Sequence, residues 1–407
     1  MPVRRNTVLL AAALAANSGM LQLSAAVASL TLVRVLGAGG LLGLGPAIVL
    51  GSGALAALPA GRLMDRVGRV PVLAGGFLIG AAGAALAGLG SAAGSRWLVL
   101  AGLLGVGVAS GTSLLARAAA GDMYPPERRA RGIAYVLFGT VFGAILGPAV
   151  FAPLLHGRAL DGDALLVLWL GGAALMLVAL VFVVFVRPDP REIARRLEAE
   201  GLAPGDPPPP PAAAAPLREI LRRPGVLPAL IAAQASFAVM VGVMTLTGAV
   251  VVDHHHHAAH TVFPIIGAHV LGMYALVIVV GDVIDRVGRA PCLVGGLLVM
   301  AVAAGSLTWI ESVWATAIAL FGLGLGWNLS FVAATAELAD RSGAFERGRL
   351  LGLNDLLSGM TGAALALIGG LALDGLGVPA LALGAAALVL LPAGWLAARR
   401  RPVMATS

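Results

Sequence analysis

The chain has 407 residues, of which 59% are hydrophobic and only 12% are charged, and its formal net charge is +7. A soluble domain would carry about a quarter charged residues, so this composition excludes an ordinary water-soluble protein. Apolar stretches recur at about 20 residues, the length that a helix needs to cross a hydrocarbon core of roughly 30 Å. The sequence therefore predicts an all-α, multi-pass membrane protein.

Twelve apolar stretches are predicted to cross the membrane as helices. Arginines concentrate in every second connection and at both ends of the chain, for example at Arg5 and Arg400. The positive-inside rule therefore predicts that both termini lie in the cytoplasm, with the chain in the inner (cytoplasmic) membrane. The predicted spans are residues 7–33, 41–60, 71–90, 97–119, 132–154, 164–186, 227–250, 261–280, 291–309, 314–336, 350–373 and 378–397.

A polar segment, residues 187–224, interrupts the hydrophobic pattern after the sixth span. Its charged part, residues 191–200, is expected to form a short surface helix. The proline run at 207–211 favours an extended polyproline conformation. We therefore predict a cytoplasmic Pro-rich linker between an N-terminal six-helix bundle at 1–186 and a C-terminal six-helix bundle at 225–407.

The two bundles carry an internal repeat. The sequence Asp-Arg-Val-Gly-Arg occurs at 65–69 and, 220 residues later, at 285–289. Each copy follows the second span of its bundle. Ordinary positively charged loops would explain the arginines, but they would not explain the duplicated Asp and Gly positions. The repeat therefore indicates two related halves in parallel order.

The longer stretches 61–69 and 281–289 resemble the cytoplasmic signature loop of the major facilitator superfamily. This resemblance implies the major facilitator fold, which has twelve transmembrane helices in two six-helix pseudo-repeats. It also implies alternating access, with each loop acting as a conformational latch whose contacts break when the halves rock. The residues assigned to the latch are Gly61, Asp65, Arg66, Gly68, Arg69, Gly281, Asp285, Arg286, Gly288 and Arg289.

Three glycines of the fifth span, Gly139, Gly143 and Gly147, resemble part of the antiporter motif of the same superfamily. The downstream Gly-Gly of that motif is absent. We therefore favour the simpler interpretation that small residues allow close helix packing.

The predicted spans offer few polar groups to a substrate. None of the twenty acidic residues lies near the middle of a span, whereas exporters of cationic drugs usually need a carboxylate there. The spans expected to line a cavity offer Gln234, Trp327 and Asn328 among a small number of polar or aromatic residues.

The most distinctive side chains lie on the seventh and eighth spans. Met240 and Met244 are four residues apart, as are His269 and Met273, so each pair shares one face of its helix. Antiparallel neighbours would bring Met244 level with His269 and Met240 level with Met273. Thioethers with one imidazole suit Cu(I) better than zinc or hard cations. The alternative is that methionines fill gaps in apolar packing.

This pattern of methionines and histidine resembles the copper-importing branch of the superfamily. The resemblance implies metal ligation by Met240, Met244, His269 and Met273, and import of copper across the inner membrane for cytochrome c oxidase assembly. A connection rich in histidine is expected to capture metal outside the membrane. Its possible ligands are Asp253, His254, His255, His256, His257 and His260.

Two alternatives to copper import stay open at this point. One is a multidrug or metabolite exporter of the same fold, and the other is a copper-binding assembly factor that does not transport. An enzyme is not expected, because the sequence shows no nucleophile–base pair, P-loop or cofactor motif. The expected partners are a copper ion as substrate, the lipid bilayer and a cytoplasmic copper chaperone or oxidase assembly factor. We expect a monomer with no resident cofactor and no nucleic acid.

Overall fold

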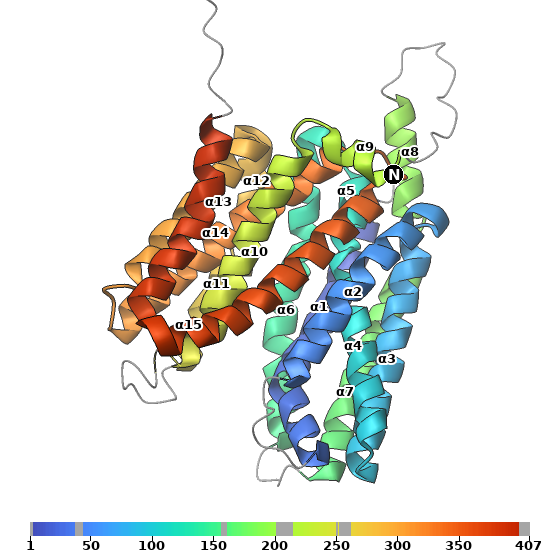
Figure 1. Cartoon of the computed structure of the whole chain (residues 1–407). Helices are drawn as coiled ribbons and strands as arrows, with labels where there is room; N and C mark the ends of the chain where they lie inside the picture. Colours follow the sequence, from blue (N-terminus) through green and yellow to red (C-terminus); the bar gives the residue numbers. More distant parts are fainter. Residues whose placement is uncertain are drawn as a thin grey trace, which may run out of the picture. The chain divides into compact units, whose positions relative to one another are not determined.

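The computed structural model describes residues 3–36, 44–155, 161–200, 215–249, 251 and 262–398, and these residues are predominantly helical (Figure 1). The chain divides into two compact units. The first combines Met1–Ile220 with Ser342–Met360, and the second combines Leu221–Arg341 with Thr361–Ser407. A segment from late in the sequence therefore belongs to the first unit. The domain boundaries inferred from the sequence, at 187 and 225, stay a prediction.

The first unit contains the first six predicted spans, the linker helix α8 and the first four residues of α9. The fourth span is two helices in line, α4 and α5, and the predicted surface helix at 191–200 is present as α8. The proline run at 207–211 lies outside the described residues. The helices are α1 (Val3–Leu36), α2 (Leu44–Val67), α3 (Arg69–Ala93), α4 (Arg96–Leu114), α5 (Ala116–Met123), α6 (Arg129–Leu155), α7 (Gly162–Val184), α8 (Pro190–Glu200) and α9 (Leu217–Arg222).

Glycine allows the helices of this unit to approach each other closely. Helix α1 packs on α6 and α7, and α4 packs on α2 and α3. A Cβ atom at Gly139 would lie 2.0 Å from the carbonyl oxygen of Ala11, and one at Gly143 would lie 2.2 Å from that of Ala15. These distances leave no room for a side chain. They confirm that both glycines serve close packing of α6 against α1.

The second unit is centred on α14 (Val313–Asp340), which contacts each of the helices α10 to α13. The predicted eighth span is not one straight helix, because it bends by 42° between α11 and α12. Helix α15 starts in the first unit, and Gly377 interrupts its helical backbone with φ 75° between the last two predicted spans. The other helices are α10 (Val226–Ala249), α11 (Val262–Tyr274), α12 (Val277–Val287), α13 (Arg289–Ser306) and α15 (Arg347–Ala398).

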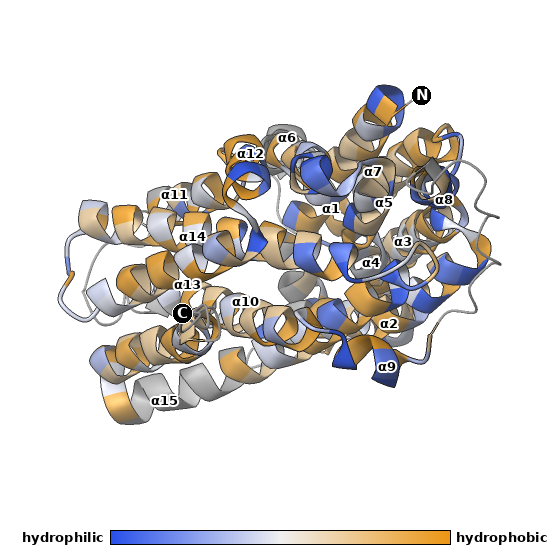
Figure 2. Ribbon diagram, turned by 90° about the horizontal axis from the view of Figure 1, so that it is seen from above, coloured by the Kyte–Doolittle hydropathy of each residue, from blue (hydrophilic) through white to orange (hydrophobic). Residues whose placement is uncertain are grey.

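The helices are long and apolar enough for a multi-pass membrane protein. Among the described residues, nine helices pass this test, or ten if the bent pair of α11 and α12 counts as one span. The other two predicted spans are α6 and the first part of α15, whose side chains are described only in part. Hydrophobic residues predominate along the long helices, whereas the linker helix α8 is largely hydrophilic (Figure 2). The orientation of the termini stays a prediction.

Candidate functional site

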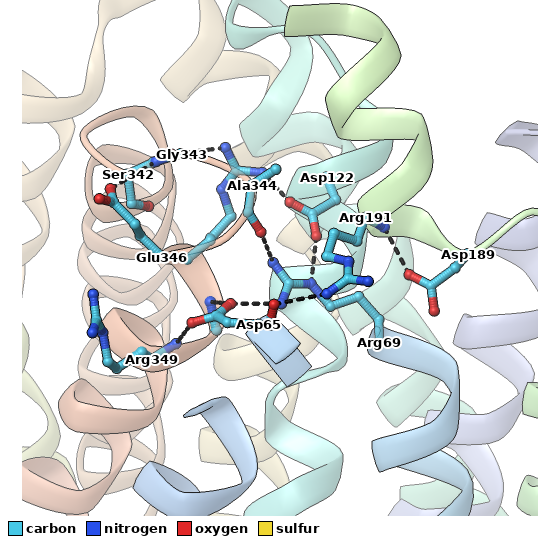
Figure 3. Close-up of polar contacts among 12 residues, drawn as sticks. Asp65, Arg69, Asp122, Asp189, Arg191, Ser342, Gly343, Ala344, Glu346 and Arg349 are labelled. Atoms are coloured by element: carbon cyan, nitrogen blue, oxygen red, sulfur yellow. Dashed lines mark hydrogen bonds and ion pairs between the residues drawn. The ribbon is translucent and has the colours of Figure 1, made fainter. Parts of the chain in front are cut away.

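The centre of the first repeated loop is Arg69, whose side chain is completely buried (Figure 3). Its Nη1 donates to Asp65 Oδ1 at 2.7 Å, and its Nε donates to Asp122 Oδ2 at 2.6 Å. Its Nη2 donates to the carbonyl oxygen of Ala344 at 2.8 Å. A buried guanidinium is costly unless it is paired and hydrogen-bonded, and this one is paired with two carboxylates.

Asp65 joins this arginine to the first turn of α15. Its Oδ1 accepts the backbone N–H of Gly348 at 2.9 Å, and its Oδ2 accepts the backbone N–H of Arg349 at 2.7 Å. The first N–H groups of a helix have no partner within the helix, and the helix dipole favours a negative charge there. Asp65 therefore binds the start of α15 through both hydrogen bonds and charge.

Asp122, near the end of α5, completes a buried group of charges that we call the Arg69 cluster: Asp65, Arg69, Asp122 and Arg347. The two oxygens of Asp122 bind Arg69 and Arg347, and both arginines are almost entirely buried. Arg347 also donates to the carbonyl oxygen of Ser342 at 3.0 Å. The cluster thus attaches the segment Ser342–Met360 to α2, α3 and α5.

Steric constraints explain why two of the predicted latch residues, at positions 61 and 68, are glycines. A Cβ atom at Gly61 would lie 2.1 Å from the carbonyl oxygen of Gly348, so α2 and α15 meet backbone to backbone there. Gly68 connects α2 to α3 with φ 109°, a conformation that other residues rarely adopt. The space next to it is occupied by the carboxylate of Asp189.

The linker helix α8 contributes to the same site from its N-terminal end (Figure 3). Asp189 Oδ2 accepts the backbone N–H of Val70 at 2.9 Å. Arg191 Nη1 donates to the carbonyl oxygen of Asp65 at 2.7 Å, and its guanidinium lies over the ring of Phe345. The linker therefore contacts both the repeated loop and the segment Ser342–Met360, to which Phe345 belongs.

The second repeated loop reproduces the core of this geometry inside the second unit. Arg289 Nη1 lies 2.8 Å from Asp285 Oδ1, and its Nε lies 3.1 Å from Asp340 Oδ2. Asp340 ends α14 much as Asp122 lies near the end of α5. Gly288 has φ 104° and repeats the role of Gly68, and Gly281 is buried in α12.

Two of the predicted latch residues, Arg66 and Arg286, point outward and are exposed. Sequence reasoning also missed four charged residues that the structure places in the interior, namely Asp122, Arg347 and the ion pair of Arg117 with Asp355. The repeat itself held a signal for Asp122, because Asp340 ends the corresponding helix of the second half. Arg347 looked like an ordinary loop arginine, and Arg117 lay at the very end of the predicted span 97–119.

The four residues predicted to bind metal lie on α10 and α11 in the second unit. Met240, His269 and Met273 are buried, and Met244 is half-buried. Both helices pack mainly on α14, and they contact each other only slightly. The sequence suggested close antiparallel pairing of these two helices. In the described residues, each of them instead makes its main contact with α14. The histidine-rich connection with Asp253, His254–His257 and His260 lies outside the described residues.

His269 has one engaged nitrogen and one unengaged nitrogen. Its Nδ1 lies 3.0 Å from the carbonyl oxygen of Leu320, and a carbonyl can only accept, so Nδ1 carries the hydrogen. In the neutral ring, Nε2 then has a free lone pair, and it is buried with no hydrogen-bond partner in the described part of the chain. Metal-binding histidines are commonly oriented by such a second-nitrogen bond.

An aromatic group from α11 and α14 lies at the bend between α11 and α12. The rings of Trp327 and Phe331 stack with centroids 4.6 Å apart, and Tyr274 meets Trp327 edge to face at 6.2 Å. Tyr274 is the last residue of α11. The side-chain N–H groups of Trp327 and Asn328 are buried without a partner among the residues that the structure describes.

The backbones of α11 and α14 meet closely along this region, which we call the α11–α14 seam: His269, Met273 and Tyr274 with Trp327, Asn328 and Phe331. A Cβ atom at Gly272 would lie 2.2 Å from the carbonyl oxygen of Phe321, and one at Gly324 would lie 2.4 Å from that of His269. The seam is therefore a fixed contact that combines aromatic faces with buried, unpartnered polar groups.

Two helical units, each with an Asp-Arg ion pair in its repeated loop, are the organisation expected of a membrane transporter built from repeats. The model of the Major Facilitator Superfamily matches residues 8–366. The chain therefore belongs to the major facilitator superfamily, which confirms the family inferred from the duplicated loop.

Two relatives and one solved structure are similar over most of the chain. The chain is 32% identical to the uncharacterized MFS-type transporter YdeG of Bacillus subtilis over 376 residues, which is 90% of this chain and 85% of that protein. It is 32% identical to the riboflavin transporter RfnT of Brucella anthropi over 310 residues, or 75% of this chain and 73% of that protein. The proton:xylose symporter XylE has the same fold, with a TM-score of 0.77 at 15% identity, covering 97% of this chain and 95% of that one. None of these three names gives support to the resemblance to copper importers.

We predict that Asp65→Asn loosens the attachment of Ser342–Met360, because Asn keeps the size of the side chain but loses the charge that Arg69 and the start of α15 share. Loosening is measured by the accessibility of a cysteine introduced in place of Ala344, which is 1% exposed in the docked segment Ser342–Met360. The single native cysteine is removed by Cys292→Ala. Its maleimide labelling should become roughly tenfold faster, a loss of about 1.4 kcal/mol of docking free energy.

The matched control for this experiment is Asp163→Asn, which neutralises an exposed carboxylate at the start of α7. It should leave the labelling rate unchanged. Equal labelling rates with and without Asp65→Asn would show that the Arg69 cluster does not hold the segment in place.

Proposed function

We propose that this protein transports a small, planar heteroaromatic metabolite of the flavin type across the membrane by alternating access. The observation that carries the proposal is the α11–α14 seam, where stacked aromatic rings lie next to two buried N–H groups without partners. An unpartnered buried donor costs free energy, and a substrate with carbonyl or ring-nitrogen acceptors would compensate for that cost. An aromatic face beside the donors suits a planar ring.

The bend in the eighth span supports this location. Discontinuous helices near the middle of the membrane commonly form the substrate sites of transporters, because their freed backbone groups can bind a solute. Here the break follows Tyr274 directly, and Tyr274 contacts Trp327. The relative RfnT, which is named a riboflavin transporter, supports the same class of substrate.

The Arg69 cluster supplies the second requirement of alternating access, a contact that can form and break. It attaches one segment, Ser342–Met360, through charges and helix N–H groups that water could also solvate. Such polar contacts can exchange protein partners for water as the conformation changes, whereas tightly packed apolar contacts leave a void. The latch function inferred from the duplicated loops is part of this proposal.

The test is uptake of riboflavin, which is fluorescent, into liposomes containing the purified protein. We expect Trp327→Leu to reduce the initial rate of uptake roughly tenfold, because stacking of a planar ring on an aromatic side chain contributes about 1–3 kcal/mol. The matched control is Trp314→Leu, because Trp314 starts the same helix but is 77% exposed. A rate unchanged by Trp327→Leu, or wild-type protein that moves no riboflavin, would reject the flavin-type substrate.

Copper import is the second candidate function, and the free Nε2 of His269 favours it. A buried imidazole nitrogen with a lone pair, on a ring held in one orientation, is a suitable ligand for Cu(I). Buried thioethers lie at Met273 on the same helix, α11, and at Met240 on α10. Met244 and the histidine-rich connection would belong to the same entry route. In this case the copper ion is the substrate, and delivery to oxidase assembly would follow on the other side.

Copper import is tested separately by uptake of radioactive copper into cells. If His269 and the methionines bind the ion, His269→Ala and the pair Met240→Leu with Met244→Leu should each reduce uptake more than tenfold. Leu keeps the apolar volume and costs little in a packed core, but it cannot bind copper. Met176→Leu, at a buried methionine of α7, is the control for packing alone. Normal copper uptake by the double methionine variant would mean that these sulfurs only pack.

A further inference from the structure

A second buried ion pair lies deeper in the first unit than the Arg69 cluster. Arg117 at the start of α5 binds Asp355 of α15, and both side chains are nearly inaccessible. Asp355 lies eight residues after Arg347, about 12 Å along the helix at 1.5 Å per residue. The pair therefore joins the fourth span to the eleventh well inside the helical bundle.

Asp355 differs from the two carboxylates of the Arg69 cluster in its hydrogen bonds. Both oxygens of Asp65 and both oxygens of Asp122 accept from arginine or backbone N–H groups. Asp355 uses only Oδ1, which binds Arg117 and lies 3.4 Å from Asn354 Nδ2. Its Oδ2 is buried and has no hydrogen-bond partner among the described residues.

An unpartnered carboxylate oxygen in a dry interior favours the protonated acid. Hydrogen bonds to the charged form stabilise that form, and Asp355 has fewer of them than its two neighbours. Arginine side chains keep their charge in proteins, so in this pair the carboxylate is the group that can change its charge. The described residues of the first unit include four buried carboxylates, those of Asp65, Asp122, Glu346 and Asp355. Among these described residues, only Asp355 has a buried oxygen without a hydrogen-bond partner, so it is the one that is chemically prepared to take up a proton.

We propose that Asp355 is the proton-binding residue that couples transport by this protein to a proton gradient. A proton from the aqueous phase bonds to Oδ2 of Asp355, and the carboxylate becomes a neutral acid. The pair then changes from net zero charge to +1, and its electrostatic attraction is lost. Helix α15 is released from α5, and return of the proton to water on the other side restores the pair. This inference rests on the proposed transport function, whichever solute is carried.

The charges around Asp355 are consistent with this role. Arg117 of α5 faces it directly. The other charged groups on α5 and α2 are Asp122, the buried Asp65, and the exposed arginines Arg62 and Arg66. On α15 itself, Arg347 binds Asp122, and the backbone N–H of Arg349 binds Asp65. The carboxylates of the cluster are thus already compensated, and Arg117 is the cation that binds Asp355.

The first experiment does not depend on the substrate. Infrared difference spectra of the purified full-length protein, recorded while pH is lowered, should show a carboxylic acid C=O band that is absent from Asp355→Asn. Glu192→Gln, at an exposed residue of α8, should keep the band. Arg117→Gln provides a second variant: without its cation, Asp355 should stay protonated to higher pH, so the band should appear at higher pH than in wild type. A band unchanged in both Asp355→Asn and Arg117→Gln would overturn the proposal.

The second experiment uses liposomes loaded with riboflavin. Asp355→Asn should lose accumulation driven by an imposed pH gradient, by more than tenfold, but should keep exchange of labelled for unlabelled riboflavin. Gradient-driven accumulation at the wild-type rate in Asp355→Asn would overturn the proposal. If wild-type protein moves no riboflavin at all, the flavin-type substrate is rejected, and the infrared band alone decides whether Asp355 binds the proton.

Discussion

The burial of Arg69 is the constraint on which the hydrophilic end of the first unit depends. A guanidinium keeps its charge under all physiological conditions, so a buried one needs carboxylates and carbonyl oxygens around it. Asp65, Asp122 and Ala344 meet this need, and they come from α2, α5 and the segment before α15. One charge therefore fixes three distant parts of the chain. Asp122 then requires Arg347, which extends the same compensation to the start of α15.

The close helix contacts follow from this electrostatic arrangement. Asp65 can reach the backbone N–H groups of Gly348 and Arg349 only if α2 and α15 approach within backbone contact. Glycine at positions 61 and 348 makes this approach possible, since a Cβ atom at either would meet the opposite backbone below 3 Å. Charge and small size thus act together: the carboxylate supplies the attraction, and the glycines supply the space.

Much of the fold could be predicted from the sequence, because membrane spans are encoded locally by length and hydrophobicity. The duplicated Asp-Arg loop also identified the family, and it includes Asp65 and Arg69, two of the four residues of the Arg69 cluster. The partners of that loop could not be found in the same way. Gly348, whose backbone N–H binds Asp65, lies 283 residues from it in the sequence. Arg347 lies next to Gly348, and nothing in the local pattern distinguishes a buried arginine from one in an exposed loop. The bend after Tyr274 was missed for a related reason, since the hydrophobic pattern continues across it.

The proposed substrate site shows the same limit. The spacing of Met240, Met244, His269 and Met273 predicts one face on each helix, but spacing does not say which third helix both of them pack on. In the structure α14 is that helix, and it brings Trp327, Asn328 and Phe331 to the residues of α11. Of these, Trp327 and Asn328 had been noted among the polar and aromatic residues of the spans. Their stacking and their unpartnered N–H groups became visible only with the helices assembled.

The central claim is that Ser342–Met360 docks on the first bundle through the Arg69 cluster and leaves it during transport. The most direct measurement is the distance distribution between spin labels at Leu63 on α2 and Met360 on α15, which are both exposed. The account predicts two populations, a short distance in the docked state and a longer one, with Asp65→Asn enriching the longer distance. A single distance that is the same in wild type and in Asp65→Asn would contradict it.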